Sequence, residues 1–535
     1  MTKPRTTRPT TTSKDAKTAR PASPYERIHE KPRPARQQDG QDSRPIARSA
    51  GKAAGADRAL PKAQLPRSQA SATQAPGPRA SGARTVGTRT TEARPPKTRA
   101  ASTPVFRAPV SSSAATEPKV PGAKISRRAA DRLRAGHLWV YASDVESVEL
   151  PAGEPPALLP VADSRGLLLG TALYSPSSQI ALRMVSREAL DEAAWLQLLE
   201  ARLRKAIRRR KPLLDERTNA CRLCFSEADE LPGLVVDRYG ELVILQLLVK
   251  GLDSAAVRET SVRVLREELA PAAILERPDP KMRELEGLAA PNLAPLFVEN
   301  AAAPTARTEF MLNGLSFHYD ANSGQKTGAF LDQRANYAAA TEWARKLGAA
   351  RSGSEGPGCG GRALDVCCYQ GGFALHLAQV CAQVTGIDSS RASLEVAEQN
   401  LEANRSLLTA QVDWVEGDAF EILRGWSEAG EQYDVIVLDP PAFAKSQRAV
   451  EGALRGYKEL NLRALKMLRP GGLLVTCSCS HHVGWAELEA SVASAAADAH
   501  RRVRLLERRG AALDHPVVLN LPETEYLKCL LLEVE

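Results

Sequence analysis

The chain has 535 residues and a formal net charge of +9, a length that suits about three domains with sizeable cores. Nine cysteines in such a chain are too few for a disulfide-stapled scaffold. No apolar run approaches the roughly 20 residues needed to cross a bilayer. We therefore expect a soluble, cytoplasmic protein without a membrane segment.

Residues 1–123 form a basic segment that is poor in aromatic residues. It holds 24 of the 72 Lys and Arg residues and 8 of the 63 Asp and Glu residues, which leaves 48 against 55 in the rest of the chain. Its aromatic residues are Tyr25 and Phe106, so it cannot bury enough apolar surface to offset chain entropy, and we predict a disordered tail. The charge fits an electrostatic tether for RNA, and it equally fits a solvated extension without a specific role.

Short apolar runs separated by Gly, Pro and Asp turns follow in residues 124–190. This spacing predicts a small β-barrel. A basic helix that begins near Ile125 leads into an aromatic strand around Trp139 and Tyr141. That entrance resembles the start of a PUA domain, a small RNA-binding barrel, although a basic helix that merely faces solvent has the same composition. The predicted strands cover 137–141, 157–161, 166–170 and 180–185.

Residues 191–320 read as a central α+β domain. An amphipathic helix over 191–212 precedes a hairpin formed by 233–237 and 242–249. We expect a further helix near 252–268 and strands near 272–276 and 308–319. Cys221 and Cys224 form a lone C-x-x-C pair. A structural zinc site needs four ligands, so we predict two half-buried strand cysteines and no metal.

Residues 321–535 change to an alternation of helix and strand, which predicts an α/β, Rossmann-like domain with a doubly wound sheet of seven strands. A final pair of strands closes the sheet. The predicted strands lie near 363–367, 384–388, 411–415, 433–438, 472–477, 503–508 and 526–534, with helices near 371–381, 390–404, 418–425, 451–468 and 485–498.

The first of these strands contains Asp365 and runs into a turn with Tyr369 and Gly371, where the backbone can approach a ligand closely. Asp388 ends the second strand, where a carboxylate can accept hydrogen bonds from both hydroxyls of a ribose. These features fit NAD as well as S-adenosylmethionine (SAM). We predict SAM because the turn is not G-x-G-x-x-G, because Asp365 suits the methionine amino group, and because Asp418 can accept from the adenine amine. Each of these carboxylates could also be an ordinary helix N-cap.

The fourth strand ends at Asp439-Pro440-Pro441-Ala442-Phe443. Proline cannot continue a central strand, so Asp439 lies where the chain leaves the sheet, at the edge where such sheets bind ligands. An acidic residue followed by Pro-Pro-x-Phe resembles the substrate loop of methyltransferases that modify a nitrogenous base. Asp439 is therefore expected to contact both the cofactor and the base.

The fifth strand ends at Cys477-Ser478-Cys479, which places a thiol at the same edge. Carbon 5 of cytosine is a poor nucleophile, but a thiolate that adds to carbon 6 makes carbon 5 enamine-like and able to accept a methyl group. Cys479 lies further past the strand end and is the predicted nucleophile, with Asp439 as the acid that stabilises the adduct. Cys477 is the rival, and buried structural cysteines remain the alternative for both.

The motifs at 227–240, 324–334 and Asp514-His515-Pro516, together with those described above, resemble the motifs of a known family. This family is the bacterial 23S ribosomal RNA 5-methylcytosine methyltransferases of the large-subunit methyltransferase I type. The resemblance covers roughly residues 124–535 and implies a PUA domain, a central α+β domain and a SAM-binding domain. Counted from Pro470-Gly471-Gly472, the family's nucleophile falls on Cys479. The motifs that carry the resemblance are 227–240, 324–334, Tyr369-Gln370-Gly371-Gly372-Phe373, Asp439-Pro440-Pro441-Ala442-Phe443, Ser478-Cys479-Ser480 and Asp514-His515-Pro516.

Further site residues follow from these motifs. Phe443, together with Pro440 and Pro441, is expected to stack on or pack beside a flipped base. Lys326 and Arg334 are expected to contact either the cofactor carboxylate or RNA phosphate, unless they are ordinary loop charges. Other RNA cytosine-5 methyltransferases have a second cysteine where this chain has Ala442 and Phe443. The base that removes the carbon 5 proton is therefore unassigned, with His481 and His482 as candidates.

Three other functions are compatible with parts of the pattern. The nearest is an rRNA base-nitrogen methyltransferase, for example one that makes 7-methylguanine, because such enzymes share the Asp-Pro-Pro loop and need no thiol. The second is a non-catalytic RNA-binding assembly factor that keeps the fold as a scaffold. A dehydrogenase is the third. The expected partner is large-subunit rRNA, and a homodimer is compatible with the sequence.

Overall fold

In a computed structural model of the chain, every element described below belongs to one compact unit, Val110–Glu535. The predicted tail lies outside the described residues except for its last two positions. Among the described residues no helix is long and apolar enough to cross a membrane. The structure describes residues 122–151, 157–289, 292–300, 306–323, 327–352 and 361–535.

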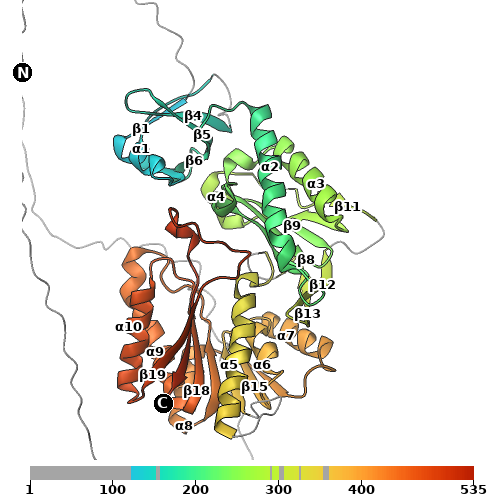
Figure 1. Cartoon of the computed structure of the whole chain (residues 1–535), viewed down its shortest axis with the longest axis vertical. Helices are drawn as coiled ribbons and strands as arrows, with labels where there is room; N and C mark the ends of the chain where they lie inside the picture. Colours follow the sequence, from blue (N-terminus) through green and yellow to red (C-terminus); the bar gives the residue numbers. More distant parts are fainter. Residues whose placement is uncertain (1–121, 152–156, 290–291, 301–305, 324–326, 353–360) are drawn as a thin grey trace, which may run out of the picture. The chain divides into compact units, whose positions relative to one another are not determined.

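The first domain is a six-stranded sheet in the order β2-β6-β5-β4-β1-β3 (Figure 1). β1 pairs with β4 in parallel, and the other neighbours are antiparallel. The predicted basic helix is present as α1 (Arg127–Arg134), and Ser126 caps it by accepting a hydrogen bond from the Ala129 N–H. The strands are β1 (Gly122–Ile125), β2 (Trp139–Tyr141), β3 (Val145–Glu149), β4 (Leu158–Asp163), β5 (Leu168–Tyr174) and β6 (Ile180–Ser186).

The central domain is a five-stranded sheet in the order β11-β10-β9-β8-β7 with helices packed on it. β8 and β9 form the predicted hairpin. Cys221 and Cys224 lie on β7 and are fully buried, more deeply than predicted. No cluster of metal-ligating side chains occurs among the described residues. The elements are α2 (Glu192–Arg210), β7 (Ala220–Phe225), β8 (Leu234–Tyr239), β9 (Leu242–Leu247), α3 (Ala255–Leu269), β10 (Ala273–Glu276), α4 (Pro280–Glu286) and β11 (Phe297–Val298).

The single strand predicted over 308–319 was wrong, because the segment forms two antiparallel strands, β12 (Arg307–Leu312) and β13 (Leu315–Asp320). Asn313 and Gly314 join them, and both have a positive φ, 54° and 91°. A two-residue turn with positive φ at both positions matches the twist of a hairpin and favours Asn-Gly. The Asn-Gly signal was present in the sequence and marks the turn.

The third domain contains the predicted seven-stranded sheet, in the order β16-β15-β14-β17-β18-β20-β19. The first five strands are parallel, and β20 is antiparallel to both of its neighbours. The strands are β14 (Arg362–Val366), β15 (Gln383–Asp388), β16 (Gln411–Glu416), β17 (Tyr433–Leu438), β18 (Leu468–Ser478), β19 (Val503–Arg509) and β20 (Lys528–Val534).

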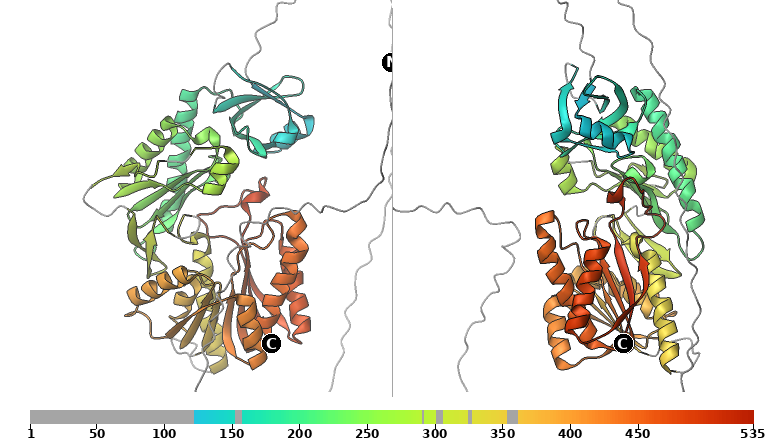
Figure 2. Two further views of the ribbon diagram at one scale, coloured as in Figure 1. Left: turned by 180° about the vertical axis from the view of Figure 1, so that it is seen from behind. Right: turned by 60° about the vertical axis from the view of Figure 1, so that its left-hand side comes forward.

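Helices cover both faces of this sheet (Figures 1 and 2). Residues of the central strands alternate between the two faces: Val437 belongs to the core beneath α5 and α6, whereas Leu438 belongs to the core beneath α9 and α10. Burial on both faces explains why the strands read as nearly continuous apolar runs. The helices are α5 (Arg334–Ser352), α6 (Gly372–Leu377), α7 (Arg391–Ala403), α8 (Ala419–Ala429), α9 (Val450–Met467) and α10 (Trp485–Asp498).

The strand order creates a crevice at one edge of the sheet. From β14 the chain winds outward to β15 and β16 and then returns to the other side of β14 as β17. Strand order reverses at β14, and open α/β sheets bind ligands in the crevice outside the carboxyl ends of the strands at such a point. The carboxyl ends of β14, β15, β17 and β18 are therefore where a site is expected.

Candidate active site

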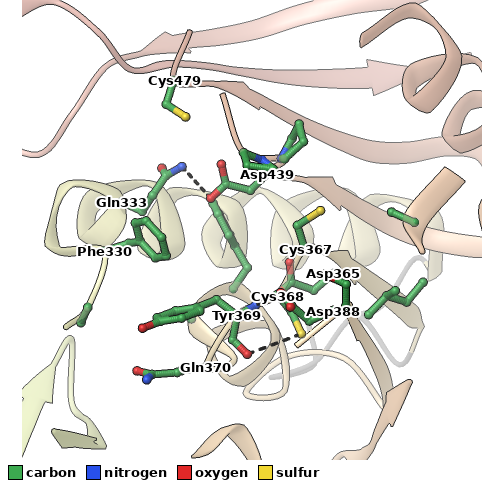
Figure 3. A pocket seen from close by; sticks show the side chains of 18 of the residues that line it. Phe330, Gln333, Asp365, Cys367, Cys368, Tyr369, Gln370, Asp388, Asp439 and Cys479 are labelled. Carbon is green, nitrogen blue, oxygen red and sulfur yellow. Dashed lines mark hydrogen bonds between the residues drawn. The ribbon is translucent and has the colours of Figure 1, made fainter. Parts of the chain in front are cut away.

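A cavity of about 510 Å³ opens at this edge of the sheet. Figure 3 shows Cys479 and Asp439 toward one end of it and Asp365, Asp388 and Tyr369 toward the other. The structure thus brings together side chains from four strand ends that are far apart in sequence. The predicted site residues that line the cavity are Asp365, Tyr369, Asp388, Asp418, Asp439, Pro440, Pro441, Phe443 and Cys479.

The turn after β14 has an unusual backbone. Cys367 and Tyr369 have positive φ values of 64° and 51°, and Gly371 has 84°. A left-handed conformation costs a non-glycine residue about 1 kcal/mol or more, so the surrounding contacts must hold the turn. The Tyr369 N–H donates to Asp388 Oδ2 at 2.9 Å, and the Tyr369 hydroxyl donates to the Gly328 carbonyl at 2.8 Å. Gly371 caps α6 and does not itself line the cavity.

Asp365 is a buried carboxyl group that lines the cavity. Its Oδ2 accepts from the Ala374 N–H at 2.8 Å, whereas its Oδ1 is buried and accepts no hydrogen bond from any described residue. Burial raises the pKa of Asp365 to about 8, and the charges of Asp439 and Asp388 contribute to the rise. The buried Oδ1, which has no other partner among the described residues, is suited to accept a hydrogen bond from a cationic donor, such as the amino group of methionine.

Asp388 and Asp418 complete the set of carboxylates expected to hold the cofactor. Asp388 Oδ1 accepts from the Ser390 N–H at 2.9 Å, and a carboxylate oxygen can accept a second bond from a ribose hydroxyl. Asp418 is the N-cap of α8, and its Oδ1 accepts from Phe420 and Glu421. It also lines the cavity, so the N-cap and adenine-contacting interpretations are compatible. These three carboxylates supply the hydrogen-bond acceptors that SAM requires.

Asp439 is held by a row of side-chain amides. The Gln333 Nε2 donates to Asp439 Oδ2 at 2.9 Å, as Figure 3 shows. The Gln333 Oε1 accepts from the Asn336 Nδ2 at 2.6 Å, and the Asn336 Oδ1 accepts from the Arg509 Nε at 3.0 Å. Gln333 belongs to the motif at 324–334, but the sequence did not reveal this contact with Asp439.

The two candidate nucleophiles occupy different environments. Cys477 is fully buried within β18 opposite Cys529 of β20, and burial raises its pKa well above the usual range. Cys479 follows the last residue of β18, is partly exposed and lines the cavity. Cys479 therefore lines the same cavity as Asp439, whereas Cys477 does not line it.

The two serines that flank Cys479 brace its position. Ser478 donates to the Tyr457 hydroxyl at 2.9 Å, and that hydroxyl lies 3.0 Å from the Ser480 Oγ. The Ser480 Oγ also accepts from the Ala444 N–H at 3.1 Å. Ala444 follows Phe443, so this contact joins the Cys479 segment to the Asp439-Pro440-Pro441 loop. The sequence offered no spacing that could have identified Tyr457.

Phe443 lines the cavity and packs against the Tyr457 ring, with centroids 4.9 Å apart. An aromatic ring in this position is suited to contact a planar base. The expected proton acceptors are less well placed, because neither His481 nor His482 is among the residues that line the cavity. Desolvation and the charge of Lys528 lower the pKa of His481.

The structure does not support a ligand-binding role for Arg334. Its side chain is buried, it donates to the Ala220 carbonyl at 3.1 Å, and it lies 3.5 Å from the Asp514 carboxylate. It is not among the residues that line the cavity. Lys326, the other predicted contact, lies outside the described residues. Arg334 instead links α5 to β7 and to the Asp514-His515-Pro516 motif.

Replacing Arg334 with methionine should therefore destabilise the protein rather than weaken RNA binding. The change leaves the Asp514 carboxylate buried without its cationic neighbour, a loss of about 3 kcal/mol in the free energy of unfolding. Urea unfolding at pH 7 measures it. The control is Arg345→Met, which removes an exposed ion pair with Glu342 and should cost about 1 kcal/mol or less. Unchanged stability with weaker rRNA binding would contradict the structural role.

Comparisons with known proteins agree with this description. A family model described as a PUA-like domain matches residues 123–187, and a model described as an S-adenosylmethionine-dependent methyltransferase matches residues 291–521. The predicted PUA-like domain and the predicted cofactor are thereby confirmed.

The chain is also similar to curated proteins over most of its length. It is 35% identical to a ribosomal RNA large subunit methyltransferase I from Erwinia tasmaniensis over 394 residues, which cover 73% of this chain and 94% of that protein. It is 36% identical to the protein of the same name from Shewanella denitrificans over 406 residues, 75% of this chain and 96% of that protein.

Solved structures share the fold at lower sequence identity. A crystal structure of SMU.776, a methyltransferase complexed with SAH, aligns with a TM-score of 0.63 at 20% identity, over 77% of this chain and 100% of that chain. A SAM-dependent methyltransferase from Streptococcus mutans aligns with a TM-score of 0.62 at 19% identity, over the same shares.

Proposed function

The chain belongs to the ribosomal RNA large subunit methyltransferase I family, and we propose that it methylates carbon 5 of a cytosine in large-subunit rRNA. The SAM-dependent methyltransferase domain and the PUA-like domain are those of the family. The position of the methyl group on the base is our proposal.

The observation that carries this proposal is the location of Cys479. It lines the same cavity as Asp439 and Phe443, at the opposite end from the carboxylates expected to hold the cofactor. A base-nitrogen methyltransferase has no use for a thiol at that point, whereas methylation at carbon 5 depends on one. The buried alternative, Cys477, lacks access to the cavity.

The residues divide the chemistry as follows. Asp365, Asp388 and Asp418 bind and orient the cofactor, which supplies the methyl group. The Cys479 thiolate adds to carbon 6 of the cytosine, while the protonated carboxyl group of Asp439 donates to N3 at the polar edge of the base and so stabilises the negative charge of the adduct. After the new bond to carbon 5 has formed, the carbon 5 proton passes to a base, the sulfur–carbon bond breaks and the thiolate leaves.

The residues around Cys479 are also suited to recognise an unpaired cytosine. A base inside an RNA helix is not accessible to a thiol, so the target must be unpaired or flipped out of the stack. The Phe443 ring and the two prolines before it provide an apolar wall for such a base. The PUA-like domain, a fold that resembles known RNA-binding barrels, is the proposed site for neighbouring RNA.

The product nucleoside tests this function directly. The purified protein is incubated with tritiated SAM and rRNA from cells that lack it, and the RNA is digested to nucleosides. Label in 5-methylcytidine is the expected result. Label in 7-methylguanosine would instead support the base-nitrogen alternative. Absence of label from any rRNA preparation, with SAM bound by calorimetry, would favour a non-catalytic RNA-binding role.

A further inference from the structure

A buried lysine lies beside the proposed nucleophile. Lys528 is the first residue of β20, and it pairs in register with Ser478, the last residue of β18. Its side chain is only 3% exposed. Burial of a lysine ammonium carries a large desolvation cost, so neighbouring groups must compensate its charge.

The contacts of the Lys528 Nζ place it at the turn that carries Cys479. It donates to the Ser480 carbonyl at 2.9 Å and to the Tyr526 carbonyl at 3.0 Å. Ser480 directly follows Cys479 in the chain. An ammonium has three protons, and these two carbonyls account for two of them. Neither carbonyl carries a full charge that could balance the ammonium.

We propose that Lys528 is a positioning residue that fixes the turn around Cys479 and stabilises this cysteine in its thiolate form. The inference rests on the proposed role of Cys479 as nucleophile. A thiolate is the reactive form of cysteine, and neighbouring cationic groups favour it. Lys528 would thereby keep the nucleophile ready before RNA arrives.

Other polar and charged groups near the turn also act on the Cys479 thiolate and on the Lys528 ammonium. Asp439 lines the same cavity as Cys479, and a negative charge there opposes the thiolate; the Tyr457 hydroxyl of α9 contacts Ser478 and Ser480. Glu525 and Glu487 interact electrostatically with Lys528, and the charge of Lys528 also acts on His481. Burial lowers the pKa of Lys528, whereas the negative charges of Glu525, Cys479 and Glu487 oppose that shift. The lysine is thus electrostatically coupled to Cys479.

The pH dependence of Cys479 alkylation tests the proposal without RNA or SAM. Full-length protein is treated with iodoacetamide between pH 6 and 10, and mass spectrometry with fragmentation separates modification of Cys479 from that of Cys477. In the wild type we expect a midpoint below 8.5, roughly the value for an ordinary thiol. A wild-type midpoint at or above that value would overturn the proposal without the need for any variant.

The second part of the alkylation test compares the wild type with variants of Lys528. Lys528→Met keeps the length of the side chain and removes its charge, so the midpoint should rise by about one pH unit and alkylation at pH 7 should slow about tenfold. Lys528→Arg should restore most of the rate. The control, Lys458→Met, removes the same charge from an ion pair with Asp498 on another surface and should leave the midpoint unchanged.

A merely structural lysine would give a different result. Lys528→Met would then lower the melting temperature while the alkylation midpoint stayed at its wild-type value. Because the readout is alkylation of the free protein, it remains valid whichever nucleoside the methyl group labels. Label in a nucleoside other than 5-methylcytidine would refute the role of Cys479 in methylation and leave the measured coupling of the two side chains intact.

Discussion

Replacing Cys479 with alanine should reduce methyl transfer to rRNA by about a thousandfold or more, because without a nucleophile carbon 5 of cytosine is not activated. SAM affinity should change little, since Cys479 lies at the end of the cavity away from Asp365 and Asp388. Transfer of tritium to RNA under single-turnover conditions measures the first quantity, and calorimetry measures the second.

Cys477 provides the matched control for this experiment. It lies on β18, two residues before Cys479, and is fully buried against β20. Cys477→Ala should therefore cost some stability, about 1–2 kcal/mol, and leave the rate of methyl transfer within a few-fold of the wild type. The reverse pattern would make Cys477 the nucleophile. Full activity in both variants would point to methylation of a base nitrogen.

Replacing Asp365 with asparagine should weaken SAM binding by about 10- to 100-fold, because a hydrogen bond to a charged group contributes about 1.5–3 kcal/mol. Asparagine keeps the volume of the side chain and can still accept from the Ala374 N–H. The exposed residue Asp413 on β16 serves as the control, and Asp413→Asn should leave SAM affinity unchanged. Equal affinity for the wild type and Asp365→Asn would show that the methionine amino group binds elsewhere.

The pH dependence of SAM binding provides a second test of the role of Asp365. With a pKa of about 8, Asp365 is mostly protonated at neutral pH in the free protein and must lose that proton to bind a cation. The SAM affinity of the wild type should therefore rise between pH 6 and 8 and level off above it, whereas the asparagine variant should show no such rise.

Asp365→Asn should also be more stable than the wild type in the absence of SAM, which provides a check that it folds. A raised pKa in the folded state means that folding opposes ionisation of Asp365. That penalty grows as pH rises from about 4, where the unfolded carboxyl ionises, to about 8, and is constant above that. The stability advantage of the variant should accordingly be larger at pH 8 than at pH 5.

The α/β domain was predictable because each of its strands and helices has a short, recurring sequence pattern. Strands buried on both faces produce continuous apolar runs, and the five parallel strands of the sheet were located to within a few residues except at the start of β18. The first domain was harder. β3 was missed because its valines, Val145 and Val148, are three residues apart and do not alternate, and because glutamates fill much of the strand.

The acidic residues of the site were predictable for a related reason. Asp388 and Asp439 stand at or next to a strand end, and the ends of parallel strands meet at one edge. Gln333 and Lys528 could not be found in this way. Lys528 reaches the turn that carries Cys479 only because β20 pairs with β18 in a particular register, which no local pattern encodes. The burial of Arg334 could not be predicted either, because a charged residue in a loop motif gives no sign of its burial.

In the row of hydrogen bonds from Arg509 to Asp439, each side chain donates to the next one toward Asp439. An arginine can only donate, so it fixes Asn336 with its oxygen toward β19, and Asn336 in turn fixes the amide of Gln333. The Gly510 carbonyl, which can only accept, holds the Asn336 amide in the same sense. Neither amide can flip without placing two donors or two acceptors face to face. Asp439 Oδ2 consequently always meets a donor, and a residue on the far strand of the sheet determines the polarity of the contact at its centre.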